Sequence, residues 1–359
     1  MRLAIAAALT LLAVPAAILA GRGAGEPQAP AGHAAAGTVE WETSATPAQR
    51  ARGEVQFTLS RRSKGNQWVH SATRPLAQLS GLSPAQLGAG NASNVSFDLV
   101  RDAGTIACQG SARRWRGSGA CDFRPDRAFA AWLAGRGFGS ASDSELFSLA
   151  LAGTGRAFAE EAVRQGYSGA KVADLIRAGD HGVGTDYIRD MGAHGYRVGT
   201  LATLIEMRDH GVGPDYIAEL ARNGIRDIPA DEIVRLRDHG VGADFVSAVR
   251  RAGYSDISTA DLIRLRDHGV SADFIAAARR HSGTGFATGD LVQMRDHGVS
   301  SDFLADLAAL GYGRLPAREI VQMRIHGVDA DFIRRANASG GRRTPRELVA
   351  MRIGGFAAQ

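Results

Sequence analysis

The chain has 359 residues, of which 42 are basic and 37 acidic, so its formal net charge at pH 7 is +5. The excess lies near the front: residues 21–140 contain 14 basic and 8 acidic residues, whereas residues 141–359 contain 27 and 29. A nucleic-acid-binding surface along the second part would need a basic stripe, so this balance argues against such a role.

Residues 1–20 have the pattern of an export signal. Arg2 supplies the positive start, an apolar stretch follows it, and small residues around Ala16 and Ala20 permit cleavage. We therefore expect an exported protein, periplasmic or secreted. The alternative is an uncleaved signal that anchors the protein in the inner membrane, although the apolar run is short for a membrane span. No transmembrane helix is expected in the mature chain.

The next part of the chain changes character twice. Residues 21–50 are rich in Ala, Gly and Pro and are predicted to form a disordered linker. Residues 51–139 contain stretches in which apolar and polar residues alternate, as around Phe57 and Phe97, and this is the period of a β-strand. A small antiparallel β domain is predicted here, with a helix at residues 125–137 leading towards the next region.

The only two cysteines, Cys108 and Cys121, fall in this domain. If the chain makes a tight hairpin turn at Arg114 and Trp115, the two cysteines face each other at a pair where side chains approach closely. Two cysteines in an exported protein predict a disulfide; the alternative is two buried free thiols.

The same turn collects basic and aromatic residues: Arg113, Arg114, Trp115 and Arg116. The plain interpretation of such a cluster is a solvated loop. The alternative is a contact with an anion, such as a lipid headgroup, an acidic polysaccharide or an acidic protein.

A histidine-glycine pair then recurs six times at a constant distance of 29 residues. The histidines are His181, His210, His239, His268, His297 and His326, and the glycines are Gly182, Gly211, Gly240, Gly269, Gly298 and Gly327. A fixed period of this length is typical of a solenoid. Each unit predicts two helices of about nine residues, in which a serine such as Ser258 or Ser271 begins a helix and the recurring glycine, in a left-handed conformation, ends one.

The register can be followed beyond the clear copies. Ala152-Gly153 and Gly354-Gly355 occupy the positions of the pair in two decayed units that lack the histidine. The predicted array therefore covers residues 140–356 in about eight units, and the fold class is mainly α: an α-solenoid of two-helix, 29-residue repeats preceded by the small β domain.

The histidine series does not predict a metal site. Equivalent residues of adjacent units are separated by about 10 Å, too far to share one zinc ion. A structural role at the end of the helix is favoured, where the helix dipole stabilises a cation. The aspartates before the histidines are predicted to pair with arginines and so to keep adjacent units in register. No nucleophile elbow, phosphate loop or metalloprotease motif is present, so we predict no enzymatic activity and no cofactor.

The repeated motif Leu-Arg-Asp-His-Gly-Val-x-x-Asp-Phe resembles the repeats of a group of bacterial exported proteins with tandem short helical repeats. It is also similar to the extracytoplasmic repeat tails of membrane zinc metallopeptidases of the BlaR-like type, whose membrane helices and His-Glu-x-x-His site have no counterpart here. The resemblance implies an accessory or sensing module of the cell envelope. We therefore expect a scaffold that binds an unidentified protein or peptide through its repeats; the alternative is that the front domain binds an anionic ligand or surface and the array is a spacer.

Overall fold

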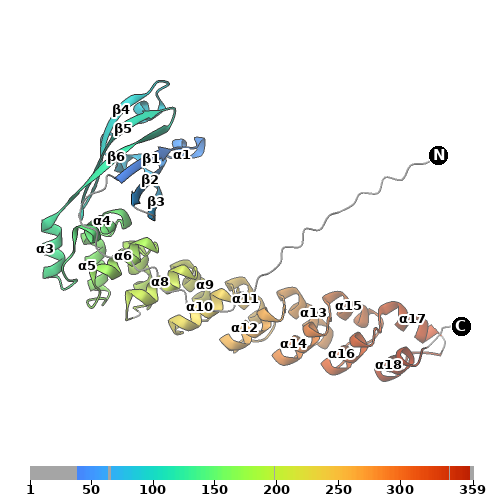
Figure 1. Cartoon of the computed structure of the whole chain (residues 1–359). Coiled ribbons are helices and arrows are strands. Elements are labelled where there is room, and N and C mark those ends of the chain that lie inside the picture. Colours follow the sequence, from blue (N-terminus) through green and yellow to red (C-terminus); the bar gives the residue numbers. More distant parts are fainter. Residues whose placement is uncertain (1–38, 64–65, 198, 339, 356–359) are drawn as a thin grey trace, which may run out of the picture. The chain divides into compact units, whose positions relative to one another are not determined.

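The computed structural model describes residues 39–355, apart from residues 64–65, 198 and 339 and the side chains of residues 62–67 (Figure 1). The predicted export signal at residues 1–20 and residues 21–38 of the predicted linker lie outside this range. The described chain forms an antiparallel sheet followed by a regular series of helices, which confirms the predicted fold class.

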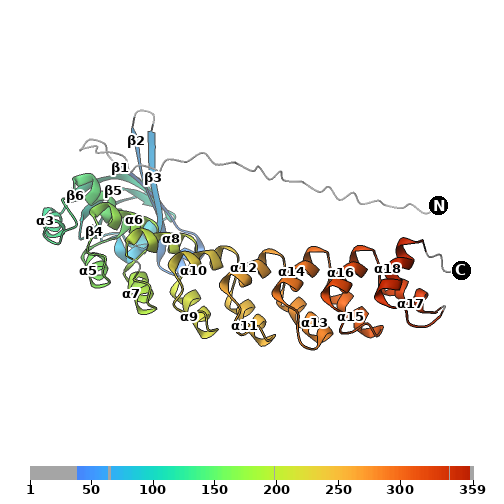
Figure 2. The same ribbon diagram turned by 90° about the horizontal axis from the view of Figure 1, so that it is seen from below.

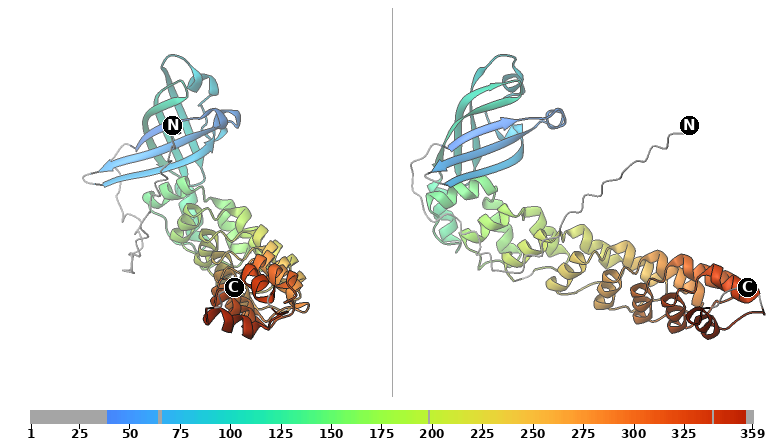
Figure 3. Two further views of the ribbon diagram at one scale, coloured as in Figure 1. Left: turned by 90° about the vertical axis from the view of Figure 1, so that its right-hand side faces the viewer. Right: turned by 45° about the vertical axis from the view of Figure 1, so that its right-hand side comes forward.

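The sheet has six strands in the order β3-β2-β1-β6-β5-β4, and every neighbouring pair is antiparallel. Figure 3 shows the strands in blue to teal, followed by the helices in green to red. The strands are β1 (Val39–Ser44), β2 (Glu54–Ser63), β3 (Asn66–Pro75), β4 (Ser93–Arg101), β5 (Gly104–Arg113) and β6 (Arg116–Pro125). Strand β1 lies between two antiparallel units, because it pairs with β2 on one side and with β6 on the other.

The prediction of a disordered linker was wrong for residues 39–50. Within β1, Val39, Trp41 and Thr43 point into the core while the residues between them are exposed. Helix α1 (Pro47–Ala51) follows, and Thr46 and Gln49 form a capping box at its start. The β domain therefore includes residues 39–50 as well as the predicted range from residue 51.

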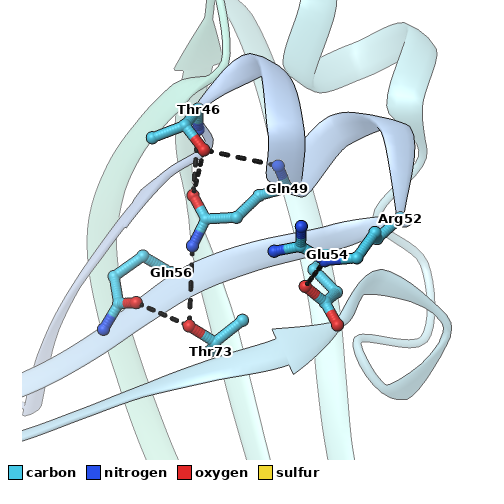
Figure 4. A network of polar contacts seen from close by, with 6 residues as sticks. All are labelled: Thr46, Gln49, Arg52, Glu54, Gln56 and Thr73. Carbon is cyan, nitrogen blue, oxygen red and sulfur yellow. Dashed lines mark hydrogen bonds and ion pairs between the residues drawn. The ribbon is translucent and has the colours of Figure 1, made fainter.

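Polar contacts tie α1 to the neighbouring strands (Figure 4). The side-chain amide of Gln49 reaches the Thr73 hydroxyl at 3.5 Å, and that hydroxyl donates to Gln56 at 2.9 Å. Arg52 and Glu54 form an ion pair at 2.8 Å just beyond the helix. This face of the sheet is polar, so the apolar core lies on the opposite face.

The connection between β3 and β4 covers the apolar face. It contains a short 3-10 helix, η1 (Leu76–Gln78), and helix α2 (Pro84–Gly88), and it buries four leucines in the core: Leu76, Leu79, Leu82 and Leu87. Trp41 is fully buried among these strands, and its indole N–H donates to the Gln109 carbonyl at 2.9 Å. A side chain at Gly117 or Gly119 would collide with the indole, so both glycines are needed beside Trp41.

Helix α3 (Arg127–Gly135) corresponds to the predicted helix at residues 125–137 and leads to the array. The array helices are α4 (Asp143–Ala152), α5 (Arg156–Arg164), α6 (Val172–Asp180), α7 (Thr185–Ala193), α8 (Leu201–Asp209), α9 (Pro214–Arg222), α10 (Ala230–Asp238), α11 (Ala243–Arg251), α12 (Thr259–Asp267), α13 (Ala272–Ser282), α14 (Thr288–Asp296), α15 (Ser301–Ala309), α16 (Ala317–Ile325), α17 (Ala330–Ala338) and α18 (Pro345–Ile353). From α4 to α18, each even-numbered helix contacts the next even-numbered one, and from α5 to α17 the odd-numbered helices do the same, so two rows of helices lie side by side (Figure 2).

The recurring His-Gly-Val motif ends the first helix of each unit. In α12, His268 is the last residue of near-helical conformation, Gly269 has a φ of +67°, and the Val270 amide donates back to the Leu265 carbonyl at 2.8 Å. This is a Schellman ending, in which the residue after the glycine packs against the helix. Val270 is buried accordingly, and a valine occupies this position in all six clear units.

The first array helices pack against the sheet. Phe147 of α4 contacts the rings of Trp68 and Phe123, at centroid distances of 5.8 and 5.2 Å. Asp102, in the β4–β5 turn, accepts a hydrogen bond of 2.6 Å from the first backbone amide of α5. The sheet therefore takes the place of a preceding repeat, which explains why the first unit departs from the repeated pattern. None of the helices described here is both long and apolar enough to cross a membrane.

Candidate functional site

The repeated histidines contact the following unit, and the set of contacts between two adjacent units is called a joint. The His181 Nδ1 lies 2.8 Å from an Asp209 carboxylate oxygen of the following unit. Three further pairs repeat this geometry: His210–Asp238 at 2.7 Å, His239–Asp267 at 2.6 Å and His268–Asp296 at 2.7 Å. The aspartates thus bond to the histidines of the preceding unit, and the expectation that they pair with arginines was wrong. For the last two histidines, His297 and His326, the corresponding positions hold Ile325 and Ile353 instead of aspartate.

The repeated arginines make a second contact between the same units. The Arg266 guanidinium lies over the Phe245 ring of the preceding unit, 5.1 Å from its centroid. The same stacking occurs for Arg208, Arg237, Arg295, Arg324 and Arg352 over Tyr187, Tyr216, Phe274, Phe303 and Phe332. Arg295 and Arg324 also donate through Nε to the carbonyls of Gly269 and Gly298, at 3.1 and 2.8 Å. The arginine therefore caps one helix while it covers the aromatic ring of the next.

These contacts give the repeated polar residues a structural role. A histidine and an aspartate at each joint provide two ligands, and the described residues contain no group of three or more His, Cys, Asp or Glu side chains placed to hold a metal ion. The hydrogen bond to Asp238 raises the pKa of His210 above its usual value. The joints thus combine ionic and aromatic contacts that keep one unit aligned on the next.

The β5–β6 hairpin has the two-residue turn proposed from the sequence. Arg114 and Trp115 have φ values of +49° and +64°, and Arg113 pairs with Arg116 across the turn. This register places Cys108 opposite Cys121, and the structure joins their sulfur atoms in a disulfide. Both cysteines lie in the core of the sheet beside Val39, which pairs with Cys121 from β1.

The arginines of the hairpin tip are exposed to solvent, whereas its tryptophan packs against the rest of the domain. The Trp115 amide donates to the Leu87 carbonyl at 2.5 Å, and its indole packs beside Gly88, so the ring is half-buried against α2. The Arg50 guanidinium covers the ring at 5.1 Å from its centroid. The three remaining tip residues, Arg113, Arg114 and Arg116, are exposed, and no described carboxylate lies within ion-pair distance of them.

Arg116 also lines a shallow hollow of about 390 Å³ on the polar face of the sheet. The other lining residues belong to the central strands: Glu42, Thr43, Ser44, Gln56, Thr58, Gly117 and Ser118. Glu42 also lines this hollow, so its negative charge offsets the positive charge of Arg116 there.

A groove lies between α11 and α13, and it was not predicted from the sequence. It has a volume of about 610 Å³ and is lined by Ala248, Arg251, Ala252, Ala272, Asp273, Ala276, Arg279, Arg280 and Gly283. The two helices are neighbours in the odd-numbered row (Figure 2). The groove lies between two of the near-equivalent units, and it combines small side chains with three arginines.

A signal for this groove was present in the sequence. Nine residues past the histidine, Asp190, Glu219 and Asp306 are acidic, whereas α11 and α13 have Ala248 and Ala277. The same two helices carry paired arginines two and three residues later. These departures from the repeat mark α11 and α13.

No model of a known protein family matches the chain, and a search of curated proteins finds no similar sequence.

Proposed function

We propose that this protein is a non-enzymatic scaffold or sensing accessory of the cell envelope, exported to the periplasm or secreted, and that its repeat array binds a protein or peptide. The observation that carries the proposal is the groove between α11 and α13. Repeat arrays commonly bind partners along surfaces formed by successive units. Here the repeated His, Asp and Arg side chains join the units, while the groove includes positions such as Ala248 and Ala252 at which the side chain varies between units.

Two features support the proposed location. Residues 1–20 have the pattern of an export signal, and a disulfide such as Cys108–Cys121 persists in oxidising compartments.

The proposal is tested by comparing the tagged full chain, produced with its own leader in its native host, with a version that ends after residue 199. The shorter version retains the sheet and the helices from α3 to α7, so Phe147 and Asp102 keep their contacts. We expect crosslinking in the envelope to retain a partner on the full chain only, and the purified partner to bind the full chain directly. Equal retention of the partner by both versions would contradict binding by the array.

The hairpin tip supports a second candidate, binding of an anionic ligand or surface by the front domain. Four arginine side chains gather there, because Arg50 joins Arg113, Arg114 and Arg116. Replacing the last three with glutamate should abolish binding to vesicles that contain an anionic phospholipid, whereas Arg124→Glu, on the same strand, is the control for a change of charge. If the triple variant binds such vesicles as well as the parent does, the tip is a solvated loop.

A further inference from the structure

The groove between α11 and α13 has an excess of positive charge. Three arginines line it and one carboxylate, Asp273, opposes them. No ion pair joins Arg251, Arg279 or Arg280 to a carboxylate of the described chain. Arg279 donates to the Ala252 carbonyl and so caps α11, whereas Arg251 makes one bond to a neutral group, the Ser247 hydroxyl at 2.7 Å. Arg251 and Arg280 are both exposed, so their guanidinium groups are accessible to a ligand.

Comparison with the neighbouring unit shows what has changed. In α9, Arg222 occupies the repeat position of Arg251 and Arg280, and Glu219 lies one helical turn before it. In α11 and α13 the residue at that place is Ala248 or Ala277. Residues three apart on a helix are neighbours, so Glu219 places a negative charge near Arg222, and α11 and α13 lack that charge.

The floor of the groove is suited to a polypeptide backbone. Ala248, Ala252, Ala272 and Ala276 come from both helices and end in a methyl group, and Gly283 has no side chain. Small residues allow another chain to approach closely, while the exposed arginines of the lining can each form paired hydrogen bonds with a carboxylate.

We propose, within the protein-binding role given above, that this groove binds an acidic peptide segment of the partner. Arg251 and Arg280 bind its carboxylates, and the alanine floor accommodates its backbone. Carboxylate recognition is favoured over a hydrophobic helix because the lining contains no large apolar side chain.

The test measures binding of a fluorescein-labelled peptide of alternating Glu and Gly residues by fluorescence anisotropy. The full chain carries Arg113→Ala, Arg114→Ala and Arg116→Ala throughout, so that the hairpin tip does not contribute. Arg251→Ala with Arg280→Ala should weaken binding roughly tenfold, the loss expected of two exposed charge pairs. Arg222→Ala with Arg189→Ala removes the same charge from α9 and α7 and should leave the affinity unchanged.

A second variant keeps every arginine of the groove. Ala248→Glu restores the acidic residue of the repeat one turn before Arg251, and it should weaken binding as much as loss of the arginines does. Ala193→Glu, an exposed position at the end of α7, adds the same charge outside the groove and is the control. Equal weakening by Ala193→Glu, or equally tight binding of a single-stranded oligonucleotide of the same charge, would overturn the proposal. If the groove variants lose the acidic peptide but still capture the envelope partner, this site is not where that partner binds, although binding by the array stands.

Discussion

The hydrogen bond between the His210 ring and Asp238 favours the protonated ring, because a positive imidazolium binds a carboxylate more strongly than a neutral ring does. The pKa of His210 is therefore raised, first by this hydrogen bond and then by the charge of nearby carboxylates. A raised pKa means that the folded state binds the proton more tightly than the unfolded state. The added stability is complete below the unfolded pKa of about 6.5 and is lost as the pH rises through the folded value.

We expect the stabilising effect of His210 to be larger at mildly acidic than at alkaline pH. The measurement compares the urea midpoint of the parent with that of His210→Gln at pH 5.5 and at pH 8.5, values chosen on either side of the usual histidine pKa of about 6.5. The control is His297→Gln, because Ile325 stands where His297 would need an aspartate. A difference that is independent of pH, or equal in the two variants, would show that the joint does not titrate.

Gly269 supplies a second prediction for a single residue. Its φ of +67° lies in the left-handed region, where a side chain costs roughly 1–2 kcal/mol. Gly269→Ala should lower the free energy of unfolding by about that amount. Gly289→Ala is the comparison, since Gly289 lies within α14 with open space around its Cα and no positive φ, and alanine there should be neutral or stabilising. Equal effects at the two sites would contradict the role assigned to the helix ending.

The sequence predicted some of these roles and missed others for a physical reason. The period shows which positions are equivalent, so the left-handed glycine and the helix start at Ser258 could be predicted, and both are present. The period does not show which equivalent positions meet across units. The aspartate was therefore assigned to arginine, whereas the arginine stacks on an aromatic ring and the histidine takes the aspartate. The period also gives no weight to a groove residue such as Ala248, because it departs from the acidic residue of the neighbouring unit.

Among the elements, the β5–β6 hairpin is held most directly, since a covalent bond closes it. The disulfide joins residues 13 positions apart in sequence. A crosslink that closes a loop of this size stabilises a protein by about 3 kcal/mol, chiefly by restricting the unfolded chain.

Replacing both cysteines with serine should therefore lower the free energy of unfolding of the sheet by about 3 kcal/mol, or more because polar atoms would enter the core. Reduction of the purified parent should add the mass of two hydrogens, and its urea midpoint should fall towards that of the variant. An unchanged mass on reduction would show that the thiols are free.

The order of strands was harder to predict than their presence. Alternation around Phe57 and Phe97 and the turn at Arg114 and Trp115 were sufficient to predict strands and one pairing. Strand β1 was missed because the Ala, Gly and Pro content of the residues before it extended the linker prediction over Val39–Ser44, although Val39 and Trp41 alternate there. Its place between β2 and β6 depends on contacts distant in sequence, which the local pattern does not encode.

At the scale of the whole molecule, the joints make the units interchangeable. From α6 to α15 each unit contacts the next through the same kinds of bonds, so stability should follow from the number of units and of joints between them. Deletion of residues 211–239 removes one period and connects His210 to Gly240, so that His210 should meet Asp267.

We expect this shortened chain to fold, with a helical circular dichroism spectrum and a urea m-value reduced in proportion to the surface lost. Deletion of residues 211–236 is the control, because it removes almost the same length but shifts the repeats out of phase. If both deletions unfold, or both are tolerated, the units are not joined as described.

Because the units are alike, the number of units sets the separation between the sheet and the groove. The sheet is fixed to α4 and α5, the acidic-peptide groove belongs to α11 and α13, and an integral number of like units connects the two. A gain or loss of one period between them would alter the separation of hairpin tip and groove by one step and leave the side chains of each intact. A partner that touched both places would therefore measure the number of repeats, and selection on that reach would act on gene duplication rather than on any single residue.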